Sequence, residues 1–168
     1  MRKVFLTINA LLTLSLIAQL YLAALGFFSP PEDELFRFHG MNGRVVLPIL
    51  LILWIVFGFV AKIGARNIGL TFAGLVLLAL QTVYFIIAGA MGATPPPNVS
   101  TPGATPYVLA LHGLGGTLLL LLTVWVFFRV KKMGPIGRTE TAGGASAEQA
   151  VPAATPSTTP SRSTTPSA

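Results

Sequence analysis

Residues 41–61 read MNGRVVLPILLILWIVFGFVA, an apolar stretch in which Arg44 is the one charged side chain. The hydrocarbon core of a bilayer is about 30 Å thick, and about 20 apolar residues of helix are needed to cross it. In lipid, the polar backbone groups must be hydrogen-bonded within the segment itself. We therefore predict a transmembrane helix over this stretch.

Three further apolar stretches of similar length cover residues 4–28, 68–91 and 107–130. Hydrophobic residues make up 53% of the chain and charged residues only 10%, whereas soluble domains carry about 25% charged residues. The leucine-rich runs are also too long for transmembrane strands. These features predict an all-α fold, a transmembrane four-helix bundle over residues 1–133.

The basic residues lie in clusters at the ends of the predicted helices. The net charge of +6 is therefore not distributed as nucleic-acid binding requires, and the expected partner is the lipid bilayer. Lys and Arg mark the cytoplasmic side of membrane proteins, so we expect a multi-pass protein of the plasma membrane with both termini cytoplasmic. The residues that place three segments on one side are Arg2, Lys3, Lys62, Arg66, Arg129, Lys131, Lys132 and Arg138.

The segments outside the four predicted helices have compositions of their own. The first stretch is longer than the 7–15 apolar residues of a signal peptide, so we expect it to be retained. Ser29, two prolines and Glu32 resemble a capped helix start, which predicts a short interfacial helix ending near His39. The proline-rich loop of residues 93–106 is expected to be extended and mobile. Residues 134–168 are rich in Ala, Thr, Ser and Pro and are predicted to form a disordered cytoplasmic tail.

The two histidines of the chain lie in similar local sequences. His39 and His112 are each followed by glycines one and four residues later, then by an apolar run with one Trp, then by basic residues. Each predicted helix that precedes a histidine carries one Gln, Gln19 or Gln81. The chain therefore resembles two tandem helical hairpins of the same orientation, related by an axis along the membrane normal.

This duplication predicts that the two histidines lie at similar depth on facing helices near the outer surface. Haem iron takes imidazole as an axial ligand, and bundle cores are common places for such a site. We therefore expect that haem b can bind between His39 and His112. Arg44 would pair with a propionate, and Gln19 and Gln81 would orient an imidazole or hydrogen-bond the cofactor.

Each of these residues also has a structural explanation. Small residues one turn apart let membrane helices pack closely, and a Gln often joins two helices by a hydrogen bond. Arg44 can extend outward to lipid headgroups. A bare zinc or copper ion would need a third ligand beside the two histidines, for which Glu32, Asp33 and Glu34 are the nearest candidates. The chain has no cysteine, which excludes disulfides, iron–sulfur clusters and covalent c-type haem.

The repeated order of Gln-bearing helix, outer loop, His-Gly-x-x-Gly, apolar helix and basic end resembles a family of small bacterial four-helix membrane proteins of unknown function. This resemblance covers about residues 1–133 and implies a fold and a membrane location. The stretch from Leu77 through Gln81 and Gly89 to His112 is more distantly similar to one half of haem A synthase. That resemblance implies that His39 and His112 are axial haem ligands.

Three functions remain open at this point: a haem protein, a scaffold, and a small transporter or lipid-binding bundle. The first is a b-type haem protein for electron transfer or haem handling, with a membrane redox partner or a second copy of the chain as its partner. The alternative is a non-catalytic membrane scaffold or accessory subunit without a cofactor. No acidic residue lies inside the predicted helices to couple ions, which argues against a transporter. No nucleophile–base pair, phosphate loop or carboxylate pair is visible, so we do not predict an enzyme.

Overall fold

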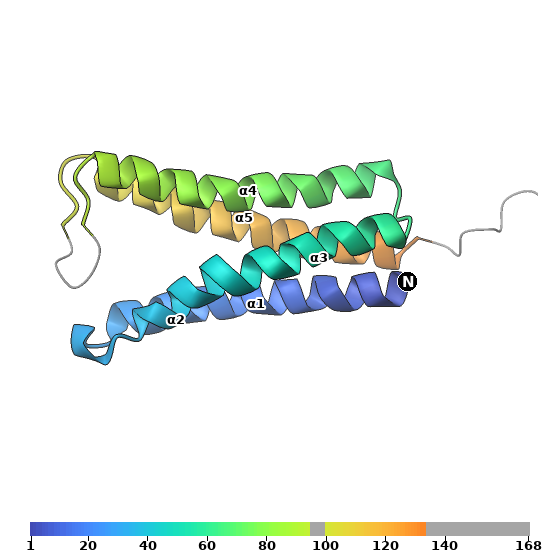
Figure 1. Cartoon of the computed structure of the whole chain (residues 1–168), viewed down its shortest axis with the longest axis horizontal. Helices are drawn as coiled ribbons and strands as arrows, with labels where there is room; N and C mark the ends of the chain where they lie inside the picture. The colour runs from blue at the N-terminus through green and yellow to red at the C-terminus, as the bar shows by residue number, and fades with distance from the viewer. Residues whose placement is uncertain (95–99, 134–168) are drawn as a thin grey trace, which may run out of the picture. The chain divides into compact units, whose positions relative to one another are not determined.

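The computed structural model describes residues 1–94 and 100–133, and within these ranges the chain is helical without a strand (Figure 1). This confirms the predicted all-α fold. The elements in chain order are α1 (Arg2–Phe28), a 3-10 turn η1 (Pro31–Asp33), α2 (Phe36–Met41), a π-helical turn η2 (Asn42–Val46), α3 (Leu47–Val60), α4 (Ala65–Ala90) and α5 (Thr105–Lys131).

Four helical segments of the described chain are long and apolar enough to cross a membrane. They are α1, the continuous run Phe36–Val60 that joins α2, η2 and α3, and the two helices α4 and α5. The chain is therefore a multi-pass membrane protein. Two predictions, the extended conformation of Pro95–Pro97 and the disorder of residues 134–168, fall outside the described residues.

The four membrane-spanning segments form a closed ring of neighbours. α1 packs against α3 and α5, and α4 packs against the same two helices. The segment Phe36–Val60 and α5, which carry the two histidines, consequently lie on one diagonal of the bundle. We call the end with the loops after α1 and α4 the histidine end, and the end with the α3–α4 turn the basic end (Figure 1).

The apolar core is concentrated toward the basic end and the middle of the bundle. α1 buries Phe5, Ile8, Leu12 and Leu16 at helical spacing, but no residue beyond Leu16. α2 and η2 bury none. Leu51, Trp54, Leu119 and Val126 complete the core from α3 and α5. The histidine end is thus only thinly packed with apolar side chains.

A polar network crosses the middle of this core. The Asn9 side chain is fully buried, and in the amide orientation that satisfies both neighbours its oxygen accepts a hydrogen bond from Trp54 Nε1 at 2.8 Å while its nitrogen donates to the Thr123 carbonyl at 3.0 Å. Thr13 donates to the Thr123 hydroxyl at 3.1 Å. Lipid offers these side chains no hydrogen-bond partner. They therefore favour the arrangement of helices in which they bond to one another.

At the basic end, hydrogen bonds join the start of α1 to the end of α5. The Arg2 guanidinium donates to the carbonyl oxygens of Val130 and, at 3.0 Å, Lys131, in the last turn of α5. The last carbonyls of a helix lack their regular partner four residues on, and a cation near a helix C-terminus also interacts favourably with the helix dipole. The N-terminus is therefore attached to the end of the fourth membrane helix.

The predicted short helix from Ser29 to His39 is wrong. The Ser29 hydroxyl does not cap a following helix but bonds back to the Leu25 carbonyl at 2.6 Å, at the end of α1. Glu34 then adopts φ +51°, a left-handed conformation that no α-helix continues through. The helix that follows begins at Phe36 and continues into the membrane, so His39 lies in the first turns of the second membrane-spanning segment.

The second membrane-spanning segment is not a uniform α-helix. The turn Asn42–Val46 is π-helical, and the amide of Leu47 bonds to the Asn42 carbonyl five residues back. Pro48 follows this turn, has no N–H and would clash with the carbonyl four residues before it, so a regular helix is disfavoured there. π-helical turns occur frequently at functional sites, and this one directly follows His39.

Candidate functional site at the histidine end

The two histidine rings meet across the diagonal of the bundle. The ring centroids of His39 and His112 lie 6.0 Å apart, with 75° between the ring planes. An aromatic ring flanks each of them, Phe36 at 5.1 Å from His39 and Phe85 at 4.7 Å from His112. Residues 73 positions apart in the sequence therefore form one contact at the histidine end.

The neighbourhood of His39 defines which ring nitrogen carries the proton. Nδ1 of His39 lies 3.1 Å from the backbone oxygen of Gln19, which can only accept a hydrogen bond. Nδ1 must therefore be the protonated nitrogen of the neutral ring, and Nε2 carries the lone pair. Metal-binding histidines are typically oriented in this way, by a hydrogen bond from the second nitrogen to a backbone carbonyl.

Nε2 of His39 is only weakly engaged. The amide nitrogen of Gln19 approaches it to 3.3 Å, but the same nitrogen donates to the His39 carbonyl at the shorter distance of 3.0 Å. The Gln19 amide nitrogen thus keeps the His39 carbonyl as its acceptor when Nε2 of His39 takes another partner. The Nε2 lone pair is available to an electrophile, such as a metal centre, at the cost of one long hydrogen bond.

Two further polar residues, which were not predicted from the sequence, hold the Gln19 side chain in place. Nδ2 of Asn42 donates to Gln19 Oε1 at 2.8 Å and to the Ser15 carbonyl at 3.0 Å. The Ser15 hydroxyl donates to Asn42 Oδ1 at 2.9 Å. The sequence signal was spacing: Asn42 follows His39 by about one turn, and Ser15 precedes Gln19 by one turn.

The second histidine lacks an equivalent support. Nδ1 of His112 and Oε1 of Gln81 are both buried and have no hydrogen-bond partner within the described residues. Gln81 donates instead to the Leu77 carbonyl of its own helix at 2.9 Å. In the predicted alignment of the two hairpins, the position of Asn42 is taken by Gly115, whose missing side chain is replaced in space by the Gln81 amide.

The remaining predicted site residues lie outside this cluster. Arg44 is exposed on η2 and does not join the histidines and glutamines. Glu32, Asp33 and Glu34 are exposed and form no metal site with His39, since the described residues contain no group of three or more metal-ligating side chains. The structure therefore brings His39, His112 and Gln19 together and places Gln81 against Gly115, about one turn from His112, while the other four residues lie outside the cluster.

Glycines leave open space beside the cluster. A Cβ atom placed on Gly40, Gly113 or Gly116 would have no other atom within 4 Å. Gly43 differs, because a Cβ there would lie 2.9 Å from the Gln19 amide nitrogen. The glycine after Asn42 is thus required for the close approach of Gln19, whereas the three open glycines are not required by contacts within this chain.

Comparison with known proteins finds a family match for part of the chain. No curated protein and no solved structure matches the chain, so the likeness to haem A synthase remains a prediction. The family match covers the segment that holds Gln19, His39 and Gln81 but ends before His112. Over residues 19–89 the chain matches a family of unknown function (DUF6220).

Proposed function

We propose that this membrane protein binds haem b at its histidine end, with His39 and His112 as the axial ligands, for electron transfer or haem handling. The observation that carries the proposal is the meeting of two imidazoles across the bundle, one of them oriented through Nδ1 by a backbone carbonyl. This orientation favours metal binding through Nε2.

The spacing of the rings is compatible with one shared metal centre. Metal–imidazole bonds are about 2.0–2.1 Å long, which places two ring centres on opposite sides of one ion roughly 6 Å apart. The centroids of His39 and His112 are 6.0 Å apart.

The surroundings also fit a flat, largely apolar group. Beyond Leu16 α1 has no buried residue, and α2 and η2 have none, so the histidine end lacks a tight apolar core of its own. Phe36 and Phe85 supply aromatic surface beside the two rings. The buried oxygen of Gln81 and nitrogen of His112 are polar atoms that still need a partner.

Each residue of the cluster then has a definite task. Gln19 holds the Nδ1–H tautomer of His39 with its backbone oxygen, and Asn42 keeps the Gln19 side chain in place. Bound haem would supply one-electron redox chemistry. Arg44, which lies exposed outside the cluster, is more simply explained by contact with lipid headgroups.

A scaffold without a cofactor is the second candidate, and one observation favours it. Gln19, His39 and Asn42 satisfy one another without any ligand, through bonds of 2.8 to 3.3 Å. A structural role, the attachment of the second membrane helix to α1, would be enough to explain such a network. On this reading His112 is a packing residue that contacts Phe85.

We place the protein in the plasma membrane with the histidine end outside and both termini in the cytoplasm. Lys62, Arg66, Arg129, Lys131 and Lys132 all lie at or near the basic end, and this excess of cations is typical of cytoplasmic loops. A haem at the opposite end would face the outer leaflet. Its partner would then be a membrane redox protein or a second copy of this chain.

Absorption spectroscopy decides between the two candidates. The full chain purified from a haem-replete host should be coloured and give a reduced-minus-oxidised spectrum of a bis-imidazole b-type haem. His39→Ala and His112→Ala should each lose that spectrum, while Phe38→Ala, an exposed ring beside His39, should keep it. A folded protein that stays colourless after addition of hemin establishes the scaffold instead, as does a spectrum that survives both histidine substitutions.

A further inference from the structure

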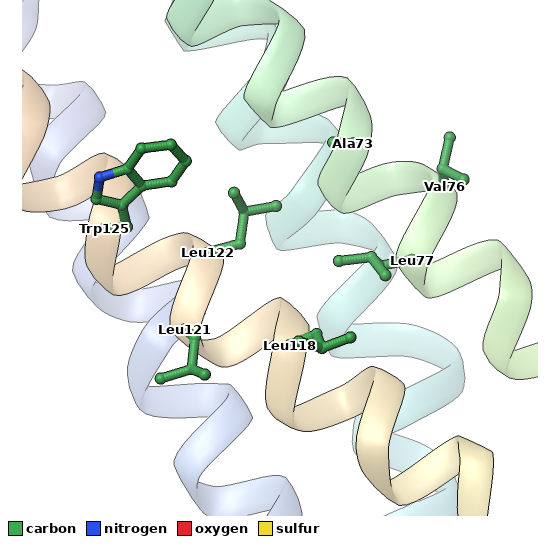
Figure 2. A pocket seen from close by; sticks show the side chains of 7 residues that line it. All are labelled: Ala73, Val76, Leu77, Leu118, Leu121, Leu122 and Trp125. Atoms are coloured by element: carbon green, nitrogen blue, oxygen red, sulfur yellow. The ribbon is translucent and has the colours of Figure 1, made fainter.

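An apolar groove runs between α4 and α5 near the middle of the membrane-spanning region. It is lined by Ala73, Val76 and Leu77 of α4 and by Leu118, Leu122 and Trp125 of α5, among others (Figure 2). This groove is separate from the histidine cluster, and nothing in the proposed function uses it.

α4 carries small side chains at and just beyond the end of this groove that faces the basic end. Ala73 lines it, and a Cβ atom on Gly69, one turn closer to the basic end, would have no other atom within 4 Å. No side chain therefore covers α4 at Gly69, one turn beyond the groove. An unbranched hydrocarbon chain lying along the bundle would fit such a shallow, extended surface.

Trp125 lines the groove at the end that faces the basic end, and Arg129 lies one helical turn beyond it. The Trp125 side chain is 50% exposed, and the guanidinium carbon of Arg129 lies 5.9 Å from the centroid of its ring. Nε of Arg129 donates to Asn67 Oδ1 at 2.6 Å, which holds the side chain between α5 and α4. This bond uses Nε alone, so the two terminal amino groups of the guanidinium can donate to another partner.

We propose that this groove binds an anionic phospholipid, with one acyl chain against α4 and α5 and the phosphate at Arg129. Arg129 follows Trp125 by one helical turn, or about 6 Å along the axis, so the cation lies just beyond the apolar channel. Guanidinium groups bind phosphate with paired, directed hydrogen bonds.

The two tryptophans make this site measurable by fluorescence. Trp54 is fully buried, whereas Trp125 lines the groove, so brominated acyl chains should quench Trp125 and spare Trp54. The full chain is reconstituted in bilayers containing brominated phosphatidylglycerol or brominated phosphatidylcholine. We expect phosphatidylglycerol to bind about fivefold more strongly relative to phosphatidylcholine, the preference that one cation supplies.

Substitutions assign the preference to the groove. Arg129→Gln should bring the ratio of the two binding constants close to one, and Arg129→Lys should retain part of it. Lys62→Gln removes the same charge from the exposed α3–α4 turn and should leave the ratio unchanged. Trp125→Phe should remove most of the quenching and thereby confirm its origin.

Three results overturn the proposal. The first is an equal response to both lipids in the unsubstituted chain. The second is a loss of preference in Lys62→Gln as large as that in Arg129→Gln, which would show a diffuse charge effect. The third is quenching that falls as the protein-to-lipid ratio rises, which would show that a second copy of the chain covers this groove. Circular dichroism of each variant establishes that it is folded.

Discussion

At the scale of single residues, Gln19 and Gln81 are the same side chain in two membrane helices, but their neighbours differ. These neighbours determine how much each glutamine contributes to stability. The oxygen of Gln19 accepts from Asn42 and its nitrogen donates to the His39 carbonyl. The oxygen of Gln81 is buried without a partner, since Gly115 stands where the first hairpin has Asn42. A buried polar atom without a partner costs about 1–3 kcal/mol.

Replacing each glutamine by methionine should therefore have opposite consequences. Gln19→Met removes the side-chain bonds to Asn42 and to the His39 carbonyl and should lower the free energy of unfolding by about 1–3 kcal/mol. Gln81→Met removes one bond to Leu77 but also the unpartnered oxygen, so the change should stay within about 0.5 kcal/mol or be stabilising. Unfolding in mixed micelles titrated with dodecyl sulfate measures both values, and equal losses at the two positions would contradict the assigned contacts.

At the scale of elements, the approach of α1 to α2 depends on a glycine. A Cβ atom on Gly26 would lie 2.6 Å from the backbone Cα atom of Phe36, a distance that only a backbone movement can relieve. The left-handed Glu34 in the preceding turn directs the chain into this approach. The position of α2, and with it that of His39, is therefore coupled to the absence of a side chain on α1.

Gly26→Ala should destabilise the bundle and displace the histidine. Overpacking of this kind typically costs about 1–3 kcal/mol. Gly89→Ala near the corresponding end of α4 is the matched control, because its Cβ would have no other atom within 4 Å, and alanine there should be neutral or slightly stabilising. Thermal unfolding in detergent compares the two. A Gly26→Ala variant as stable as Gly89→Ala would show that α1 and α2 are not in close contact.

The same elements show what sequence could predict. The four membrane-spanning segments follow directly from the lengths of the apolar runs, and the structure confirms them. The helix start at Phe36 could not be predicted, because Ser29 has the chemistry of a cap for a following helix but bonds backward to Leu25. The π-helical turn of η2 had one visible signal, Pro48, but a proline alone does not distinguish a π-helical turn from a kink.

At the scale of the whole molecule, the repeated histidine sequence predicted facing helices, and the structure places α5 diagonally opposite the segment Phe36–Val60. The repeated sequence was therefore enough to predict that the two histidine rings lie close together. The unequal support of the rings was not, because it depends on Asn42 and Ser15, whose bonds form only when η2 and α1 pack together. Pattern alone could not place these two residues in the candidate site.

The orientation of the molecule in the membrane can be tested with single cysteines, since the chain has none of its own. Glu32→Cys and Thr101→Cys lie in exposed loops of the histidine end, and Lys132→Cys lies at the exposed basic end. We expect a membrane-impermeant maleimide to label the first two in intact cells and the third only after the cells are permeabilised. This follows from the excess of Lys and Arg at the basic end, which retains that end in the cytoplasm. Labelling of Lys132→Cys in intact cells would show that the molecule has the opposite orientation. The histidine cluster would then lie at the inner leaflet, and any redox role would require a cytoplasmic partner.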